Sequence, residues 1–211
     1  MELKWAVTAI IGILLAVLCI WLAAVFIKWL SSLDWTFESA SERAGRHGEE
    51  IAAEIISRVL GEGDHLLTNI EITYDGRRAE MDCIVVNKFG AFIFEVKNYS
   101  GQLVGDEDDY EWQKIKITDT GNMYAKQVKN PIRQLKRQVY LLAHYLQSHR
   151  IRVWVDGYVI LLHQNSPVDS GYVISSLSDI DRAVHTEGKN RLRPKDMEQI
   201  ITLLQRDADE S

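Results

Sequence analysis

Cysteine is scarce in this sequence, which has only two among 211 residues. Cys19 lies in a long apolar run and Cys83 in a predicted core strand, so no disulfide framework is expected. The chain also lacks the G-x-x-x-x-G-K-[ST] phosphate loop and the G-x-S-x-G nucleophile turn. Nothing in it therefore indicates a P-loop nucleotide triphosphatase or a serine hydrolase of that kind.

Histidine-rich metal sites and calcium-binding loops are not indicated either. Five histidines show no ligand spacing: His47, His144, His149, His163 and His185. The acidic run "DEDDYE" after Gly105 lacks the glycine and the terminal glutamate of an EF-hand loop, so a solvated turn is expected. We expect Trp112 and Trp154 in the core rather than as platforms for base stacking.

One apolar run stands out near the amino terminus, because residues 5–27 include 23 consecutive positions without a charge. At 1.5 Å per residue, such a helix crosses the roughly 30 Å hydrocarbon core of a bilayer. Trp5, Trp21 and Trp29 suit interfacial anchors. A cleaved signal peptide is the alternative, but its apolar region usually has about 7–15 residues. The run therefore predicts a transmembrane helix.

This helix divides the chain into an anchor, residues 1–30, and a soluble domain, residues 31–211. Positive charge after the apolar run, at Lys28 and Arg43 for example, slightly exceeds that at Lys4 before it. The positive-inside rule then favours a cytoplasmic soluble domain. We expect a single-pass membrane protein.

The soluble part shows helical and strand periodicities but no repeat and no low-complexity block. Apolar residues at helical spacing and a proline near a helix start indicate helices, whereas alternating runs closed by turn residues indicate strands. Helices are predicted over 41–63, 130–149 and 193–207, and strands over 65–76, 80–87, 91–98, 101–105, 112–118 and 153–162. This order predicts one α/β sandwich.

Two carboxylates and a lysine interrupt two of these apolar strands. If Lys88 and Phe89 form the tip of a hairpin, Asp82 lies directly opposite Glu95, and Lys97 shares a face with Glu95. A bulge at the tip would shift this register by one residue. Like charges opposed across a strand pair are destabilising, but they suit a site for a divalent cation.

Magnesium matches these side chains. The carboxylates of Asp82 and Glu95 are hard oxygen ligands, and the Val96 carbonyl is a possible third. Lys97 would position or deprotonate a water and meet phosphate charge. The group therefore predicts metal-dependent hydrolysis of a phosphodiester. The alternative is a surface ion pair of Lys97 with Glu95 or Glu80, worth about 0–1 kcal/mol.

Five motifs resemble, in order and approximate spacing, the nuclease-related domain (NERD), a branch of the PD-(D/E)XK nuclease superfamily. They are Gly45-x-x-Gly48-Glu49, "EMDCIVV", "FEVKNYSGQLVG", Trp112 and "NPIRQ", within about residues 41–145. The resemblance implies a restriction-endonuclease-like core, in which helices flank a mixed central β-sheet. It also implies a Mg²⁺-dependent site in which Mn²⁺ can substitute.

The resemblance also implies roles for individual residues. The positions that match its site are Glu49, Asp82, Glu95, Lys97 and Gln134. Glu49 would join Asp82, Glu95 and the Val96 carbonyl as a metal ligand, and Lys97 would be the catalytic lysine. The chain departs from the family pattern at Cys83 and Gln138, where relatives often have histidine.

Basic residues gather in one segment of an otherwise acidic chain. No acidic residue lies between Asp119 and Asp156, although the formal net charge of the chain is −6. The candidates for nucleic-acid contacts in this segment are Lys126, Lys129, Arg133, Lys136 and Arg137. Such a segment could follow a nucleic-acid backbone, with binding that weakens in salt. A solvated face or attraction to anionic lipid headgroups are the alternatives.

The sequence thus predicts a membrane-anchored, metal-dependent nuclease that acts on DNA, with RNA a less expected substrate. One alternative is a membrane-tethered module of the same fold that binds nucleic acid or protein without cutting. Another is a membrane-associated assembly factor that uses the domain to bind protein partners.

Overall fold

A computed structural model describes residues 21–22, 40–118, 120–163, 168, 170–186 and 191–209. The predicted transmembrane helix, apart from Trp21 and Leu22, lies outside these residues. Among the residues described, no helix is both long and apolar enough to cross a membrane. The chain separates into two units, Met1–Ser39 and Ala40–Ser211, and the second carries the fold discussed below.

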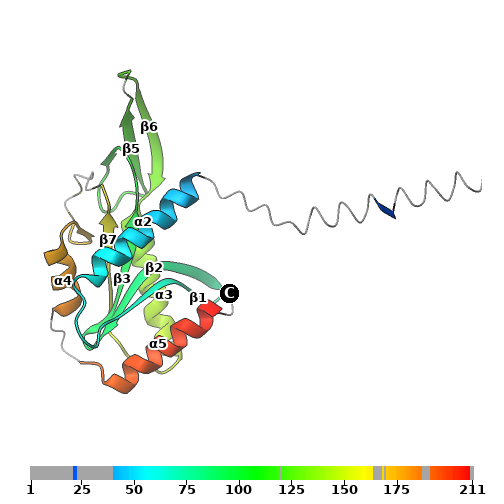
Figure 1. The fold of residues 1–211 in the computed structure, drawn as a ribbon, viewed down its shortest axis with the longest axis vertical. Helices are drawn as coiled ribbons and strands as arrows, with labels where there is room; N and C mark the ends of the chain where they lie inside the picture. Colours follow the sequence, from blue (N-terminus) through cyan, green and yellow to red (C-terminus); the bar gives the residue numbers. More distant parts are fainter. Residues whose placement is uncertain are drawn as a thin grey trace, which may run out of the picture. The chain divides into compact units, whose positions relative to one another are not determined.

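A five-stranded mixed sheet forms the centre of this unit, with strand order β1-β2-β3-β7-β8 (Figure 1). The first three strands are antiparallel, and β7 and β8 run parallel to β3. The strands are β1 (His65–Tyr74), β2 (Arg77–Asn87), β3 (Gly90–Lys97), β7 (Val155–Leu161) and β8 (Val173–Ile174). The expected mixed central sheet is confirmed.

Helices cover both faces of this sheet. They are α2 (Ala40–Ser57), α3 (Pro131–Ser148), α4 (Leu177–His185) and α5 (Pro194–Asp209). One hydrophobic cluster joins the sheet to α3 and α5, for example through Leu142 and Leu204. A second cluster joins the opposite side chains of the strands to α2 and α4, through Ile56 and Val184. The unit is therefore a three-layer α/β structure.

Two-residue turns connect the first three strands. Asp75 and Gly76 both have positive φ, 51° and 68°, as a type I′ hairpin turn requires. In the β2–β3 turn, the Asn87 side chain accepts a hydrogen bond from the Phe89 N–H at 2.9 Å. The pairs from Asn87–Gly90 to Cys83–Phe94 follow the predicted register, so no bulge shifts it.

The alternation of side chains between the two faces of β2 is interrupted at Asp82. The β1–β2 pairing omits the Asn69–Asp82 position, and Asn69 has a φ of 53° in the left-handed region. Met81 and Ile84 belong to the same hydrophobic cluster, although residues three apart in a regular strand point to opposite faces. Asp82 therefore lies at a local break in the sheet, where its side chain can leave the regular alternation.

A second sheet contains β4 (Gln102–Val104), β5 (Glu111–Ile117) and β6 (Met123–Lys129). The β5–β6 hairpin extends away from the central sheet (Figure 1). Strand β6 is missing from the predicted elements because six of its seven residues are exposed, which removes the apolar alternation on which strand prediction rests. Trp112 is buried as expected, whereas Trp154 is 65% exposed, contrary to the prediction.

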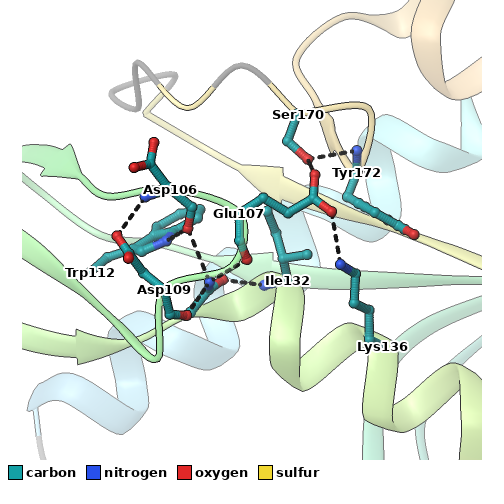
Figure 2. Close-up of polar contacts among 9 residues, drawn as sticks. Asp106, Glu107, Asp109, Trp112, Ile132, Lys136, Ser170 and Tyr172 are labelled. Atoms are coloured by element: carbon teal, nitrogen blue, oxygen red, sulfur yellow. Dashed lines mark hydrogen bonds and ion pairs between the residues drawn. The ribbon is translucent and has the colours of Figure 1, made fainter.

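Helix α3 begins at a network centred on Asn130, which is buried. Its side-chain oxygen accepts a hydrogen bond from the Ile132 N–H at 2.9 Å, and its amide donates to the carbonyls of Glu107 and Asp109 at 2.9 and 2.7 Å. Figure 2 shows Trp112 donating to the Asp106 carbonyl in the same turn. The acidic run is therefore a turn that is hydrogen-bonded to the start of α3.

Candidate active site

The acidic and basic side chains predicted in the β2–β3 hairpin lie together near the carboxyl end of β3. Glu95 is fully buried, and its Oε1 contacts the Lys97 ammonium, which is 19% exposed. The Glu95–Lys97 ion pair considered in the sequence therefore exists, but it is an interior pair and not a surface one. Burying such a pair is costly unless further polar groups satisfy it.

Asp82 joins this pair from the neighbouring strand. Its Oδ2 accepts a hydrogen bond from the Val96 N–H at 2.7 Å, one residue beyond the last regular pair, Cys83–Phe94. The N–H and C=O groups of a residue in an extended strand point to the same side, so the Val96 carbonyl also faces β2. An aspartate and a main-chain oxygen thus share the gap where β2 and β3 separate.

The electrostatics of this gap are dominated by acidic groups. Burial raises the pKa of Asp82 to about 7, and repulsion from the Glu95 carboxylate adds to the effect, while the Val96 N–H and Lys97 oppose it. Burial disfavours the charged form of Lys97, but the Glu95 carboxylate outweighs this and raises the lysine pKa. The site therefore holds a cationic lysine beside acids that repel one another.

Glu49 reaches the same region from α2. Partial burial raises its pKa, and the charges of Asp82 and Glu80 raise it further, so these carboxylates lie within electrostatic range of one another. The preceding residue, Gly48, explains how the helix comes so close. A Cβ atom there would lie 2.9 Å from the Cβ of Asn98, the residue that directly follows Lys97.

Asn98 connects α2 to the end of β3 through a hydrogen bond. Its amide donates to the Ala44 carbonyl at 2.8 Å, and its oxygen lies 2.8 Å from the Nε2 atom of His163. Asn98 lies within the "FEVKNYSGQLVG" motif, but no role could be assigned to it from the sequence, because its partners are far away along the chain. It positions the helix that carries Glu49.

Helix α3 brings a second glutamine, Gln138, to the site in addition to the predicted Gln134. Gln138, which is buried, donates from Nε2 to Glu95 Oε2 and, at 2.8 Å, to the Glu80 carbonyl. Gln134 is half-buried and lies one helical turn earlier on the same side of α3. The spacing of four residues is the sequence feature that could have suggested Gln138 as a site residue.

Two carboxylates and a main-chain carbonyl are the oxygen atoms that the gap offers to a cation. Within the ranges that the structure describes, no group of three or more His, Cys, Asp or Glu side chains is arranged to hold a metal ion. The Asp82 and Glu95 carboxylates nevertheless have the hard oxygen chemistry that Mg²⁺ takes in proteins. Together with Lys97, they could act on a phosphate ester.

The predicted basic residues are divided between two elements. Lys126 and Lys129 are exposed on β6, and the other three lie on α3. Lys136 forms an ion pair with Glu107 at 2.8 Å (Figure 2), and Arg133 lies 5.2 Å from the ring centroid of Tyr110. Arg137 donates to the carbonyl of Arg78. The helix residues thus already have partners within the chain, unlike an open basic stripe.

Comparison with known proteins adds a family to this geometry. The sequence model of the nuclease-related domain, NERD, matches residues 44–162. An uncharacterized protein of Bacillus anthracis is 30% identical over 69 residues, which are 32% of this chain and 32% of that protein. The matched part thus spans about a third of the relative's length. No solved structure has significant similarity to the chain.

Proposed function

Because this chain belongs to the nuclease-related domain (NERD) family, we propose that its α/β unit is a metal-dependent nuclease with a restriction-endonuclease-like core. It would hydrolyse phosphodiester bonds in DNA, with RNA as a second possible substrate. The observation that carries the proposal is the meeting of Asp82, Glu95 and Lys97 in the gap between β2 and β3. One buried carboxylate, Glu95, and one partly buried carboxylate, Asp82, share a single ammonium group, which is unfavourable for packing but suits a cation site.

The residues of the gap fit Mg²⁺, for which Mn²⁺ can substitute. Burial is the main cause of the raised pKa of Asp82, and the added repulsion from Glu95 reflects negative charge that Lys97 alone does not neutralise. Asp82 and Glu95 would hold the cation, with the Val96 carbonyl as a third ligand and Glu49 as a fourth. The bound cation would supply a counter-charge to the phosphate as negative charge develops during hydrolysis.

The remaining groups orient the reactants. Lys97, held as an ammonium by Glu95, would donate a hydrogen bond to a phosphate oxygen or to the attacking water, rather than accept a proton. Gln138 would hold the Glu95 carboxylate in place through Oε2. Gln134, half-buried one turn earlier, would contact the substrate.

We also propose that residues 5–27 anchor the protein in a membrane as a single helix, with the nuclease unit in the cytoplasm. The support is the length of the uncharged run. An anchored protein should resist extraction by alkaline carbonate. Its nuclease unit should be digested by external protease only after the cells are permeabilised.

The nuclease proposal is tested by nicking of supercoiled plasmid with the purified full chain. Nicking should require Mg²⁺ or Mn²⁺ and stop with EDTA. Asp82→Asn and Glu95→Gln should each lower the rate at least about a hundredfold, which corresponds to a loss of about 3 kcal/mol of transition-state stabilisation. Asp75→Asn, in the exposed β1–β2 turn, is the matched control and should nick like the wild type.

Metal binding provides a second measurement that does not depend on activity. Titration with Mn²⁺ should give weaker binding for Asp82→Asn than for Asp75→Asn. A wild-type protein that binds DNA in a salt-dependent way but never nicks it would overturn the nuclease proposal. It would favour a non-cutting binding module, for which the one supporting observation is that Lys97 and Gln138 already engage both oxygens of Glu95.

A further inference from the structure

The β5–β6 hairpin is a basic element in an acidic chain. Between Glu111 and Lys129 the sequence has four lysines and two acidic residues, Glu111 and Asp119, in a chain of formal net charge −6. Glu111 pairs with Lys129 and lies on the other face of β5 from Lys114 and Lys116. Alternation along the paired strands brings three of these lysines, Lys114, Lys116 and Lys126, to one face. We call this face of the hairpin the lysine ribbon.

Without a bound partner, the arrangement of the lysine ribbon destabilises the β5–β6 strand pair. Lys114 pairs directly with Lys126 across the two strands, and like charges opposed in this way destabilise a strand pair. In the described part of the chain, neither Lys116 nor Lys126 forms an ion pair with a carboxylate. Lys116 instead pairs across the strands with Tyr124, whose side chain is 60% exposed. An anionic partner would remove the repulsion.

Tyr99 links one end of the lysine ribbon to the candidate active site. The Lys114 ammonium lies 5.4 Å from the ring centroid of Tyr99. Burial raises the pKa of Tyr99, the positive charge of Lys97 opposes this shift, and the Glu95 carboxylate reinforces it, so this ring also lies near the site. A polyanion that follows the lysine ribbon would therefore lead towards Glu95 and Lys97.

We propose that the lysine ribbon binds the phosphate backbone of double-stranded DNA and guides it to the candidate active site. This inference rests on the proposed nuclease function and names duplex DNA as its substrate. Strand β4 pairs with β5 only as far as Ile115, so from Lys116 onward β5 and β6 form a two-stranded ribbon. Such a ribbon fits the major groove, which is about 12 Å wide. The three lysines extend over about 7 Å along the strands, which matches about two base-pair steps of duplex.

Single-stranded nucleic acid fits the ribbon less well. Binding of single strands relies on successive aromatic side chains that stack with bases. The ribbon face offers one exposed ring, that of Tyr124, among three lysines. Its charge is thus arranged for a backbone, while stacking is limited to a single position. The preference for a duplex is a direct consequence and can be measured.

The test measures binding of the full chain to a fluorescent 20-base-pair duplex DNA by anisotropy, in EDTA to prevent cleavage, over a range of salt concentrations. The ribbon variant combines Lys114→Gln, Lys116→Gln and Lys126→Gln. Its affinity in 0.15 M salt should fall at least about tenfold, and the slope of log K against log salt should decrease by about 2–3. Wild-type binding to one strand of the same sequence should be weaker.

Two controls separate binding from folding and from charge in general. Arg77→Gln, Lys88→Gln and Lys195→Gln together remove the same charge from exposed positions elsewhere and should leave duplex binding nearly unchanged. Lys126→Gln alone relieves the repulsion with Lys114, so its thermal unfolding temperature should equal or exceed that of the wild type. Its duplex binding should still weaken.

Equal duplex affinity of the ribbon variant and its charge-matched control would overturn the inference. It would also be overturned if the ribbon lysines governed binding to phosphatidylserine vesicles but not to duplex DNA. A ribbon variant that nicks plasmid with wild-type kcat and KM refutes the ribbon while the nuclease proposal stands. Ribbon-dependent duplex binding without any metal-dependent nicking supports the binding surface and refutes the nuclease.

Discussion

Substitution of Asn130 offers a quantitative test of how the start of α3 is held. Asn130→Ala removes the N-cap, worth about 1 kcal/mol, and two neutral hydrogen bonds from the buried amide to Glu107 and Asp109, worth about 1 kcal/mol each. The free energy of unfolding should therefore fall by about 3 kcal/mol. For a unit of this size, the melting temperature should drop by about 6–12 °C.

Two further variants at the same position separate these contributions. Asn130→Ser keeps a capping oxygen for the Ile132 N–H but loses the amide donors, so its loss should be about 2 kcal/mol. Asn130→Asp also keeps the capping oxygen. In the wild type, however, the Asn130 amide nitrogen lies 2.9 and 2.7 Å from the carbonyl oxygens of Glu107 and Asp109, so a carboxylate oxygen in its place would be repelled by them. This variant should be the least stable of the three.

Urea unfolding of the full chain, followed by far-ultraviolet circular dichroism, measures the series. The slope m should stay constant, so that shifts of the midpoint report stability alone. The reasoning would be refuted if Asn130→Ser were as stable as the wild type, because the amide contacts to the acidic turn would then contribute nothing. It would also be refuted if Asn130→Asp were more stable than Asn130→Ser.

The remaining predictions concern α2 and α4. Gly45→Ala should stabilise the protein by up to about 1 kcal/mol, because nothing lies within 4 Å of a Cβ atom at this position. Gly48→Ala should destabilise it by about 1–3 kcal/mol, because its Cβ atom would contact Asn98. Equal changes in the free energy of urea unfolding for the two variants would contradict the close approach of α2. Burial disfavours the charged form of His185, but its hydrogen bonds with Asp64 and Asp181 outweigh this and raise its pKa in the folded state. The stabilisation from the charged imidazole is therefore complete below about pH 6.5, and it is lost as pH rises through the raised pKa of the folded state. The melting-temperature difference between wild type and His185→Gln should therefore shrink between pH 6 and pH 8, and a difference that grows over this range would disprove the assignment.

The hairpin at the centre of the site was predictable because its geometry is local. A two-residue turn and a side-chain period of two determine which residues oppose one another, so the register from Asn87–Gly90 to Cys83–Phe94 follows from sequence positions alone. The same argument sets Asp82 directly opposite Glu95, but the regular pairing ends at Cys83–Phe94, and Asp82 instead accepts a hydrogen bond from the Val96 N–H. Helix α3 was equally predictable, since Asn130 and Pro131 form a standard helix start.

Other features depend on contacts between distant segments. Strand β6 lacks an apolar face, so only its pairing with β5 identifies it. The choice of Gln138 rather than Gln134 against Glu95 depends on which turn of α3 crosses the strand. The break at Asp82 requires the left-handed conformation of Asn69 in the neighbouring strand. None of these can be read from periodicity in a single segment.

The sequence by itself determined the types of most elements, the hairpin register and the identity of the three charged residues in the gap, because each follows from spacing within one or two adjacent segments. Only the tertiary structure decided that Glu95 is buried, that Asn98 and Gly48 bring α2 towards the end of β3, and that the pKa of Asp82 rises to about 7. The physical reason is that burial and electrostatic shifts depend on the layers that close over a strand, and those layers come from elsewhere in the chain.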